Sequence, residues 1–143
     1  MTSRSASIQG SCQSTASPAS AWAAWTNPRD WTGYAIQAAK IDGEFAVGAR
    51  ITIKAKGLPT VRLTVTGVEP KRRWTGVSKL PGLTMTFEHI AEPADAGTVL
   101  IERAILRGPL AAMAAWLLGN RLTTTFDANT AHCARVAEHH DSA

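Results

Sequence analysis

Short stretches in which apolar and polar residues alternate fill the middle of the chain. Residues 60–69, TVRLTVTGVE, show the pattern most clearly, because Val61, Leu63 and Val65 alternate with polar side chains. A period of two is typical of an antiparallel strand with one buried face. Similar stretches, separated by Gly, Pro and Asp-Gly turns, predict strands at 6–14, 35–41, 49–57, 60–69, 72–80, 83–92 and 98–108.

Three segments follow a helical rather than an alternating pattern. Ser17-Pro18 and Asn27-Pro28 each place a capping side chain before a proline, which predicts short helices at 18–26 and 28–33. After Gly108, apolar residues recur in steps of three and four, which predicts one amphipathic helix at about 109–138. We expect the last residues, HHDSA, to fray. The expected apolar positions of the long helix are Leu110, Met113, Ala114, Leu117, Leu118, Leu122, Phe126, Val136 and Ala137.

This order of elements predicts an α+β fold in a single domain, residues 1–143. A seven-stranded antiparallel sheet with one apolar face needs a cover, and the C-terminal helix can supply it. One helix cannot fill a strongly curved sheet, so we expect a cavity between the sheet and the helix.

The same order resembles the helix-grip, or SRPBCC/START-like, superfamily, which includes birch-pollen-allergen-like proteins. The phrases that carry the likeness are ASPASAWAAWTNPRDW, IDGEFAVGARITIKAKG, LTVTGVEPKRRW, LTMTFEHIAEP and LRGPLAAMAAWLLG. They are most similar to the bacterial polyketide cyclase/dehydrase-like branch. The resemblance implies a curved seven-stranded sheet wrapped around a long C-terminal helix, two short helices between strands 1 and 2, and a hydrophobic pocket without a metal or cofactor. It does not imply one reaction, since the superfamily contains carriers, receptors and enzymes.

Composition narrows the classes of partner. The chain has 45% hydrophobic and 18% charged residues and no apolar run of membrane-spanning length, so we expect no stable membrane insertion. The net charge is +4, but the basic residues are scattered except in PKRRW at 70–74, and no nucleic-acid motif accompanies them. Without an apolar leader and with only Cys12 and Cys133, we expect a cytoplasmic protein that starts at Met1. The sequence is compatible with a monomer and with a homodimer.

His89 is the strongest candidate for a catalytic residue. It alternates in phase with Met85 and Phe87, the face that we assign to the interior, where an imidazole can act as acid or base. A structural histidine satisfied by water or backbone is the competing interpretation, because the spacing shows no carboxylate partner.

Glu102 and Arg103 are neighbours on one strand, so one side chain points inward and the other outward. An inward Arg103 would stabilise an enolate, whereas an outward one would lie on the surface, and the sequence leaves both open.

The candidate catalytic residues are therefore His89, Arg103 and Tyr34. The candidate ligand-binding residues are Trp31, Trp74, Ser78, Met85, Phe87, Met113, Leu117, Phe126 and Asn129. No metal site is expected, because the spacing of the C-terminal His and Cys residues matches no known zinc pattern.

These observations favour a protein that binds a hydrophobic, polyketide- or lipid-like small molecule in an internal cavity. If it is an enzyme, we expect a cofactor-independent cyclase or dehydratase. The alternatives are a carrier that does no chemistry and a partner-binding domain, which would show a filled cavity and an exposed apolar patch.

Overall fold

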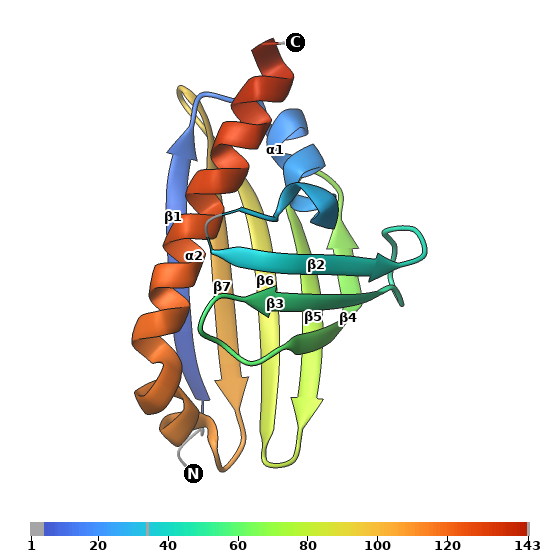
Figure 1. The fold of residues 1–143 in the computed structure, drawn as a ribbon. Coiled ribbons are helices and arrows are strands. Elements are labelled where there is room, and N and C mark those ends of the chain that lie inside the picture. The colour runs from blue at the N-terminus through green and yellow to red at the C-terminus, as the bar shows by residue number, and fades with distance from the viewer. Residues whose placement is uncertain (1–4, 34, 143) are drawn as a thin grey trace.

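A computed structural model describes residues 5–33 and 35–142 of the chain. Within these residues, seven strands, two α-helices and one short 3₁₀ helix follow one another in the predicted order (Figure 1). The elements are β1 (Ser5–Ser14), α1 (Pro18–Trp25), η1 (Pro28–Asp30), β2 (Ile36–Asp42), β3 (Arg50–Ala55), β4 (Val61–Glu69), β5 (Arg73–Leu80), β6 (Leu83–Ala94), β7 (Gly97–Arg107) and α2 (Ala111–Ser142).

The strands form one antiparallel sheet in the order β1-β7-β6-β5-β4-β3-β2. The sheet bends so strongly that β2 and β3 cross in front of β5 and β6 (Figure 1). Register shifts at Ile36/Ala38 in β2 and at Val65/Gly67 in β4 mark bulges, which add local bend to a sheet. The predicted helix-grip fold, a curved seven-stranded sheet with a long C-terminal helix, is confirmed.

Helix α2 lies along β1 at one side of the sheet, opposite the fold made by β2 and β3 (Figure 1). Gly10 of β1 allows this close approach. A Cβ atom at Gly10 would lie 2.7 Å from the backbone nitrogen of Asp127 and 2.8 Å from the carbonyl carbon of Phe126. Glycine therefore sets how near the helix comes to the sheet at this point.

Helix α2 extends further than predicted at its C-terminal end. It continues to Ser142, and the carboxylate of Asp141 accepts hydrogen bonds from the Ser17 backbone N–H at 2.8 Å and from the Ser17 and Ser20 hydroxyls. These bonds, first that from the Ser20 hydroxyl, lower the pKa of Asp141. The expectation that the tail frays is wrong for residues 139–142, because Asp141 binds the start of α1.

The predicted apolar stripe of α2 is only partly buried. Ala114, Leu122 and Phe126 pack in the core, whereas Met113 and Leu117 are 51% and 59% exposed. At about 100° per residue, Met113 and Leu117 lie roughly 60–100° around the helix from Ala114. The contact with the sheet is narrower than the apolar stripe, so the side chains of Met113 and Leu117 stay in solvent.

No helix in residues 5–33 or 35–142 is both long and apolar enough to cross a bilayer.

We predict that Gly10→Ala destabilises the protein by about 1–3 kcal/mol, the usual cost of overpacking. Gly67→Ala is the matched control, since a Cβ atom there meets nothing within 4 Å. Urea unfolding of both variants measures the difference. Equal stabilities of the two variants would contradict the close approach at Gly10.

Candidate functional site

A cavity of about 520 Å³ lies between the bent sheet and α2. Most of its lining is apolar and comes from strands β2 to β7, the β3–β4 loop and α2. Exposed residues of the β3–β4 loop and of the end of β5, such as Thr60, Lys79 and Leu80, form its mouth. His89 and Glu102, which are 1% and 7% exposed, line its deep part. The apolar lining comprises Ile36, Ile53, Ala55, Leu58, Pro59, Val61, Leu63, Leu80, Leu83, Met85, Phe87, Leu106, Ala114, Leu118, Leu122 and Phe126.

The deep part of the cavity holds a buried imidazole and a buried carboxylate. His89 on β6 pairs directly with Glu102 on β7, and its Nε2 atom lies 3.4 Å from the Glu102 Oε2 atom. The other carboxylate oxygen, Oε1, accepts a hydrogen bond of 3.0 Å from the Asn129 side-chain amide on α2. A buried carboxylate needs such donors, because burial removes the hydration that stabilises its charge.

Three tryptophans fix the His89 ring. Trp74 stacks on it with ring centroids 4.0 Å apart and planes 2° from parallel, and Trp25 meets it edge-on at 4.9 Å. Trp31 lies parallel to the imidazole at 5.5 Å. The three indole N–H groups donate to the backbone carbonyls of Ile90, Trp25 and Ala24. The rings are thus held in place themselves, and they leave the imidazole little freedom to turn.

The contacts of His89 indicate which nitrogen carries its hydrogen. Nε2 faces a carboxylate oxygen, whereas Nδ1 is buried and has no hydrogen-bond partner among the described residues. A hydrogen on Nε2 can be donated to Glu102, and Nδ1 is then left with a lone pair. The opposite tautomer would bury an unpaired N–H, which costs about 1–3 kcal/mol.

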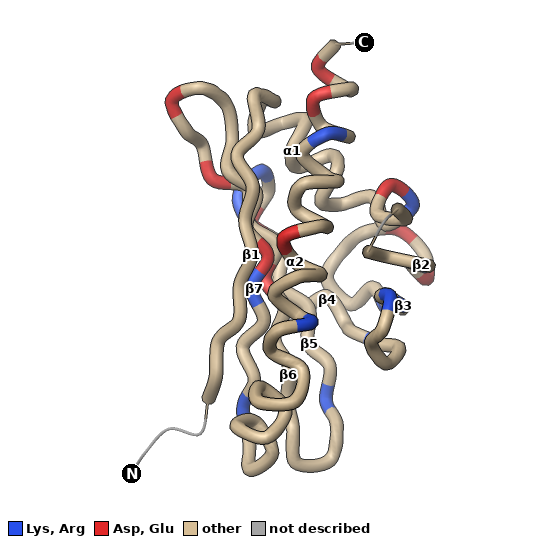
Figure 2. The backbone as a smooth tube through the Cα atoms, turned by 60° about the vertical axis from the view of Figure 1, so that its left-hand side comes forward, with Lys and Arg blue, Asp and Glu red and all other residues tan. Residues whose placement is uncertain are grey.

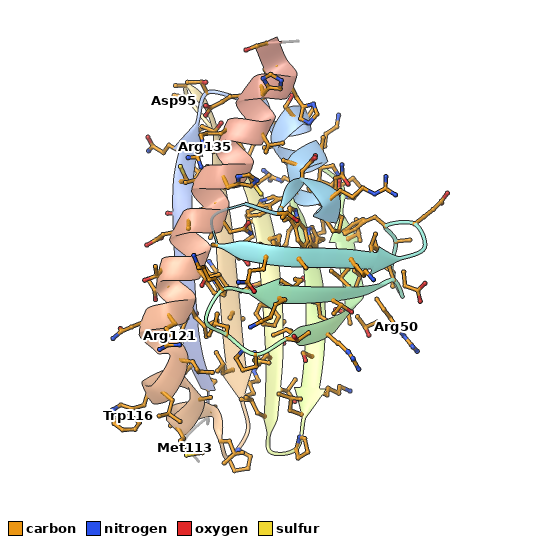
Figure 3. The ribbon with its side chains drawn as sticks, viewed as in Figure 1. Arg50, Asp95, Met113, Trp116, Arg121 and Arg135 are labelled. Atoms are coloured by element: carbon orange, nitrogen blue, oxygen red, sulfur yellow. The ribbon has the colours of Figure 1, made fainter. Side chains whose placement is uncertain are left out.

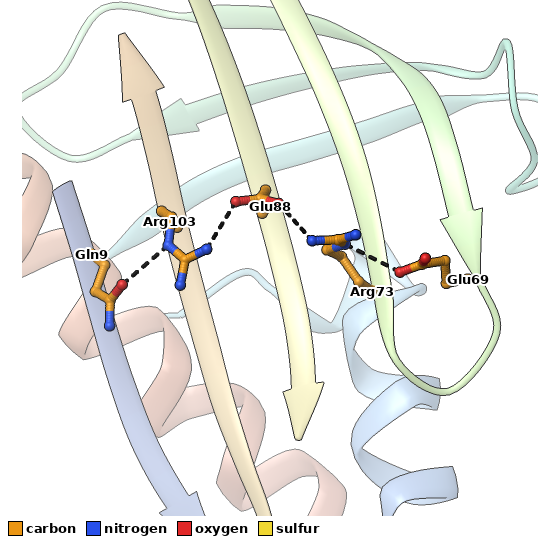
Figure 4. Close-up of polar contacts among 5 residues, drawn as sticks. All are labelled: Gln9, Glu69, Arg73, Glu88 and Arg103. Atoms are coloured by element: carbon orange, nitrogen blue, oxygen red, sulfur yellow. Dashed lines mark hydrogen bonds and ion pairs between the residues drawn. The ribbon is translucent and has the colours of Figure 1, made fainter. Parts of the chain in front are cut away.

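Arg103 lies on the opposite face of the sheet, and this settles the open choice between Glu102 and Arg103. Its side chain bonds Glu88 and Gln9, each at 3.1 Å, in a chain of polar contacts that continues through Arg73 to Glu69 (Figure 4). The hypothesis that Arg103 stabilises an enolate in the cavity is therefore wrong. The β6–β7 register pairs Arg103 with Glu88 on the outer face and Glu102 with His89 on the inner one.

The other predicted site residues do not all line the cavity. Ser78, Met85, Phe87, His89 and Phe126 line the cavity. Trp31 and Trp74 are buried in the aromatic cluster around His89 and, like Asn129, support the site without appearing in the cavity wall. Met113 and Leu117 are exposed, so their expected contact with a ligand is wrong in this structure. Tyr34 lies outside the described residues.

Sequence reasoning missed the partnership of Glu102 with His89, although a signal for it was present. Ala94 pairs with Gly97, so the β6–β7 turn contains only Asp95 and Ala96. Counting back from a two-residue turn brings positions 89 and 102 opposite each other on the same face. The strand spans predicted at 83–92 and 98–108 left this register undetermined.

A thiol extends the polar contacts behind Glu102. The Sγ atom of Cys133 lies 4.0 Å from the Asn129 side-chain oxygen. Burial, together with the nearby negative charge of Glu102, raises the pKa of Cys133. The thiol therefore keeps its hydrogen and faces the amide oxygen. In the described part of the chain, no three His, Cys, Asp or Glu side chains come together as a metal site would require.

The sequence profile of the family described as polyketide cyclase / dehydrase and lipid transport matches residues 5–138. The chain belongs to this family. A search among curated proteins found no relative by sequence.

Solved structures of other proteins share the fold of this family member. A Thalictrum flavum norcoclaurine synthase point mutant, in complex with a transition-state analogue, is 14% identical, with a TM-score of 0.74 over 99% of both chains. The di-domain ARO/CYC protein StfQ of steffimycin biosynthesis is 11% identical, with a TM-score of 0.75 over 98% of this chain and 53% of its own. A structural-genomics protein of Mesorhizobium loti is 21% identical, with a TM-score of 0.65 over 94% of this chain and 98% of its own.

We predict that Asn129→Leu destabilises the protein by about 1–3 kcal/mol, because the buried Glu102 carboxylate loses a donor. Adding Glu102→Leu should recover part of this loss, because the buried carboxylate is then gone, although the Nε2–H of His89 also loses its acceptor. Asn120→Leu, at an exposed position of the same helix, is the control. The unfolding free energies of the wild type, the two buried single variants, their double variant and Asn120→Leu form the test, and additive effects of the two buried substitutions would contradict the coupling.

Proposed function

We propose that this protein binds an apolar small molecule of polyketide or lipid type in the cavity and that Glu102, supported by His89, exchanges protons with it. The observation that carries the proposal is an apolar cavity whose deep part holds one buried carboxylate–imidazole pair. Membership of the polyketide cyclase / dehydrase and lipid transport family supports it.

The dimensions and polarity of the cavity support the proposed ligand class. A volume of about 520 Å³ falls within the range of roughly 300–1,000 Å³ that is usual for small-molecule sites. The apolar walls favour hydrocarbon or fused-ring parts, while Ser78, Thr125 and Glu102 offer polar contacts. We therefore expect a largely hydrophobic molecule with a carbonyl or hydroxyl group at the end that enters first.

The carboxylate–imidazole pair suits proton abstraction next to a carbonyl. Glu102 removes a proton from carbon, and the electron pair of the broken C–H bond forms an enolate. The enolate carbon then bonds to a second carbonyl carbon of the same molecule, and the resulting alkoxide takes the proton back from Glu102. The Nε2–H of His89 and the amide of Asn129 hold the carboxylate in position through these steps. Positioned proton transfer of this kind contributes about 10²–10⁴-fold to a rate.

The cavity ligand is the principal partner in this proposal. We also propose a cytoplasmic location, which the two free thiols of Cys12 and Cys133 support, because thiols persist in reducing compartments.

We predict that Ala114→Phe weakens binding of the neutral fluorescent probe N-phenyl-1-naphthylamine at least tenfold, because the new ring occupies the cavity next to Leu118. Ala112→Phe is the matched control, since Ala112 is exposed on the same helix. Fluorescence titration gives both dissociation constants. Equal affinities of the two variants would mean that the probe does not enter the cavity, and binding in the cavity would then be contradicted.

We predict that the wild-type protein accelerates the base-catalysed ring opening of 5-nitrobenzisoxazole, which reports proton abstraction from carbon. Glu102→Gln should lower the rate about 10²-fold or more, while the dissociation constant of N-phenyl-1-naphthylamine stays unchanged. His89→Gln should lower it less, because the carboxylate remains.

The same assay distinguishes an enzyme from a carrier. If the wild-type protein and Glu102→Gln react at the same rate and both bind the probe, the acid–base role is excluded and the chain acts as a carrier.

A further inference from the structure

Large apolar side chains gather at the end of the molecule where α2 begins. Leu110, Met113, Trp116 and Leu117 are exposed by 40%, 51%, 82% and 59%, and Leu80 at the end of β5 is 51% exposed. Figure 3 shows Met113 and Trp116 projecting outward at this end. We call these five residues the mouth patch. Among the described residues, the other large apolar side chain with such exposure is Val47, in the β2–β3 loop.

The mouth patch is continuous with the entrance of the cavity. Leu80 belongs both to the patch and to the cavity lining, and Ala114 and Leu118 line the cavity from the same helical turns that carry the patch. The Leu110 backbone N–H donates to the Gly82 carbonyl at 3.0 Å, which ties the β5–β6 turn to the start of α2. The apolar surface outside and the apolar lining inside thus meet at one rim.

The surroundings of the patch carry positive charge only. Residues 54–62, 77–87 and 104–126 contain no Asp or Glu. Figure 2 shows this end of the backbone with blue positions and no red ones, whereas red positions lie further along the molecule. Lys79 and Arg62 are exposed and line the cavity, while Arg121 donates from Nη1 to the Gly57 carbonyl at 2.8 Å. The cations of these segments are Lys54, Lys56, Arg62, Lys79, Arg107 and Arg121.

We propose that the mouth patch docks on the surface of an anionic lipid bilayer, with the cavity entrance facing the lipid. Leu, Met and Trp side chains enter the boundary between headgroups and acyl chains, and the surrounding Lys and Arg side chains contact anionic headgroups. Trp116 has the amphipathic ring that prefers this interface.

The charge pattern favours a bilayer over a second copy of the chain. A symmetric dimer through the patch would bring Lys79 and Arg107 of one copy close to the same cations of the other, and like charges across an interface repel. An anionic surface neutralises these cations instead. Docking would let an apolar ligand pass between lipid and cavity without crossing water, a consequence that rests on the proposed function.

Flotation of the purified protein with vesicles tests the docking. We expect binding to vesicles of phosphatidylcholine with 30% phosphatidylglycerol to be at least tenfold tighter than to phosphatidylcholine alone. This preference should disappear in 0.5 M salt, because the electrostatic attraction is screened. Trp116→Ser should weaken binding at least tenfold, and Val47→Ser, an exposed apolar position remote from the patch, should leave it unchanged.

Two pairs of charge substitutions, one near the mouth patch and one remote from it, test the electrostatic contribution. Lys79→Gln with Arg107→Gln should weaken binding to anionic vesicles about 25-fold, since each cation near such a surface contributes roughly fivefold. Lys40→Gln with Arg50→Gln, exposed cations on β2 and β3, should have little effect.

Three results would overturn the docking proposal. They are equal binding of Trp116→Ser and Val47→Ser, equal binding to neutral and anionic vesicles, and a dimer in light scattering that disappears in Trp116→Ser. Failure of N-phenyl-1-naphthylamine to bind the cavity, with vesicle binding intact, would count against the proposed function and leave the docking in place.

Discussion

The curvature of the sheet is the constraint on which the rest of the structure depends. An α-helix with its side chains is about 10–12 Å across, so one helix can cover only part of a strongly bent sheet. Here α2 lies against β1, where Gly10 permits close approach, and strands β2 to β4 curve around the other side. The remaining space is the cavity. Its existence is therefore a geometric result of combining a bent seven-stranded sheet with a single long helix.

The buried carboxylates on the two faces of the sheet have different kinds of partner. On the outer face, Glu88 is paired with Arg73 and Arg103, and the chain of contacts crosses five strands. On the inner face, Glu102 has no arginine or lysine partner among the described residues, and its oxygens face only Asn129 and His89. The carboxylate in the cavity is thus held by an amide and an imidazole rather than by a guanidinium. The inner pair thus faces the cavity, and the outer network joins neighbouring strands across the other face of the sheet.

Sequence patterns predicted most of the fold because strands and turns are local features. Alternation in 60–69 and proline after Ser17 and Asn27 placed the strands and short helices close to their observed bounds. The pattern could not determine which of Glu102 and Arg103 points inward, because both faces of β7 contain apolar residues. That choice depends on the register of the β6–β7 hairpin, which the two-residue turn sets and which alternation within β7 alone does not show.

The long helix shows a second limit of sequence reasoning. Met113 and Leu117 belong to the same apolar stripe as Ala114 and Leu118, and periodicity alone does not show how much of a stripe the sheet covers. Conversely, Thr130 is buried, although its polarity argues for exposure. Asn129, predicted to contact a ligand, is buried and donates to Glu102 instead. The support of the site by Asn129 follows from tertiary contact, which no local pattern contains.

The burial of Cys133 has a consequence for the motions of the molecule. Its side chain is fully buried on the face of α2 that packs in the core, and only a thiolate reacts rapidly with alkylating reagents. Reaction thus requires the helix to separate from the strands long enough for the sulfur to ionise in water. The rate at which Cys133 is alkylated therefore measures how often α2 opens away from the core by local unfolding.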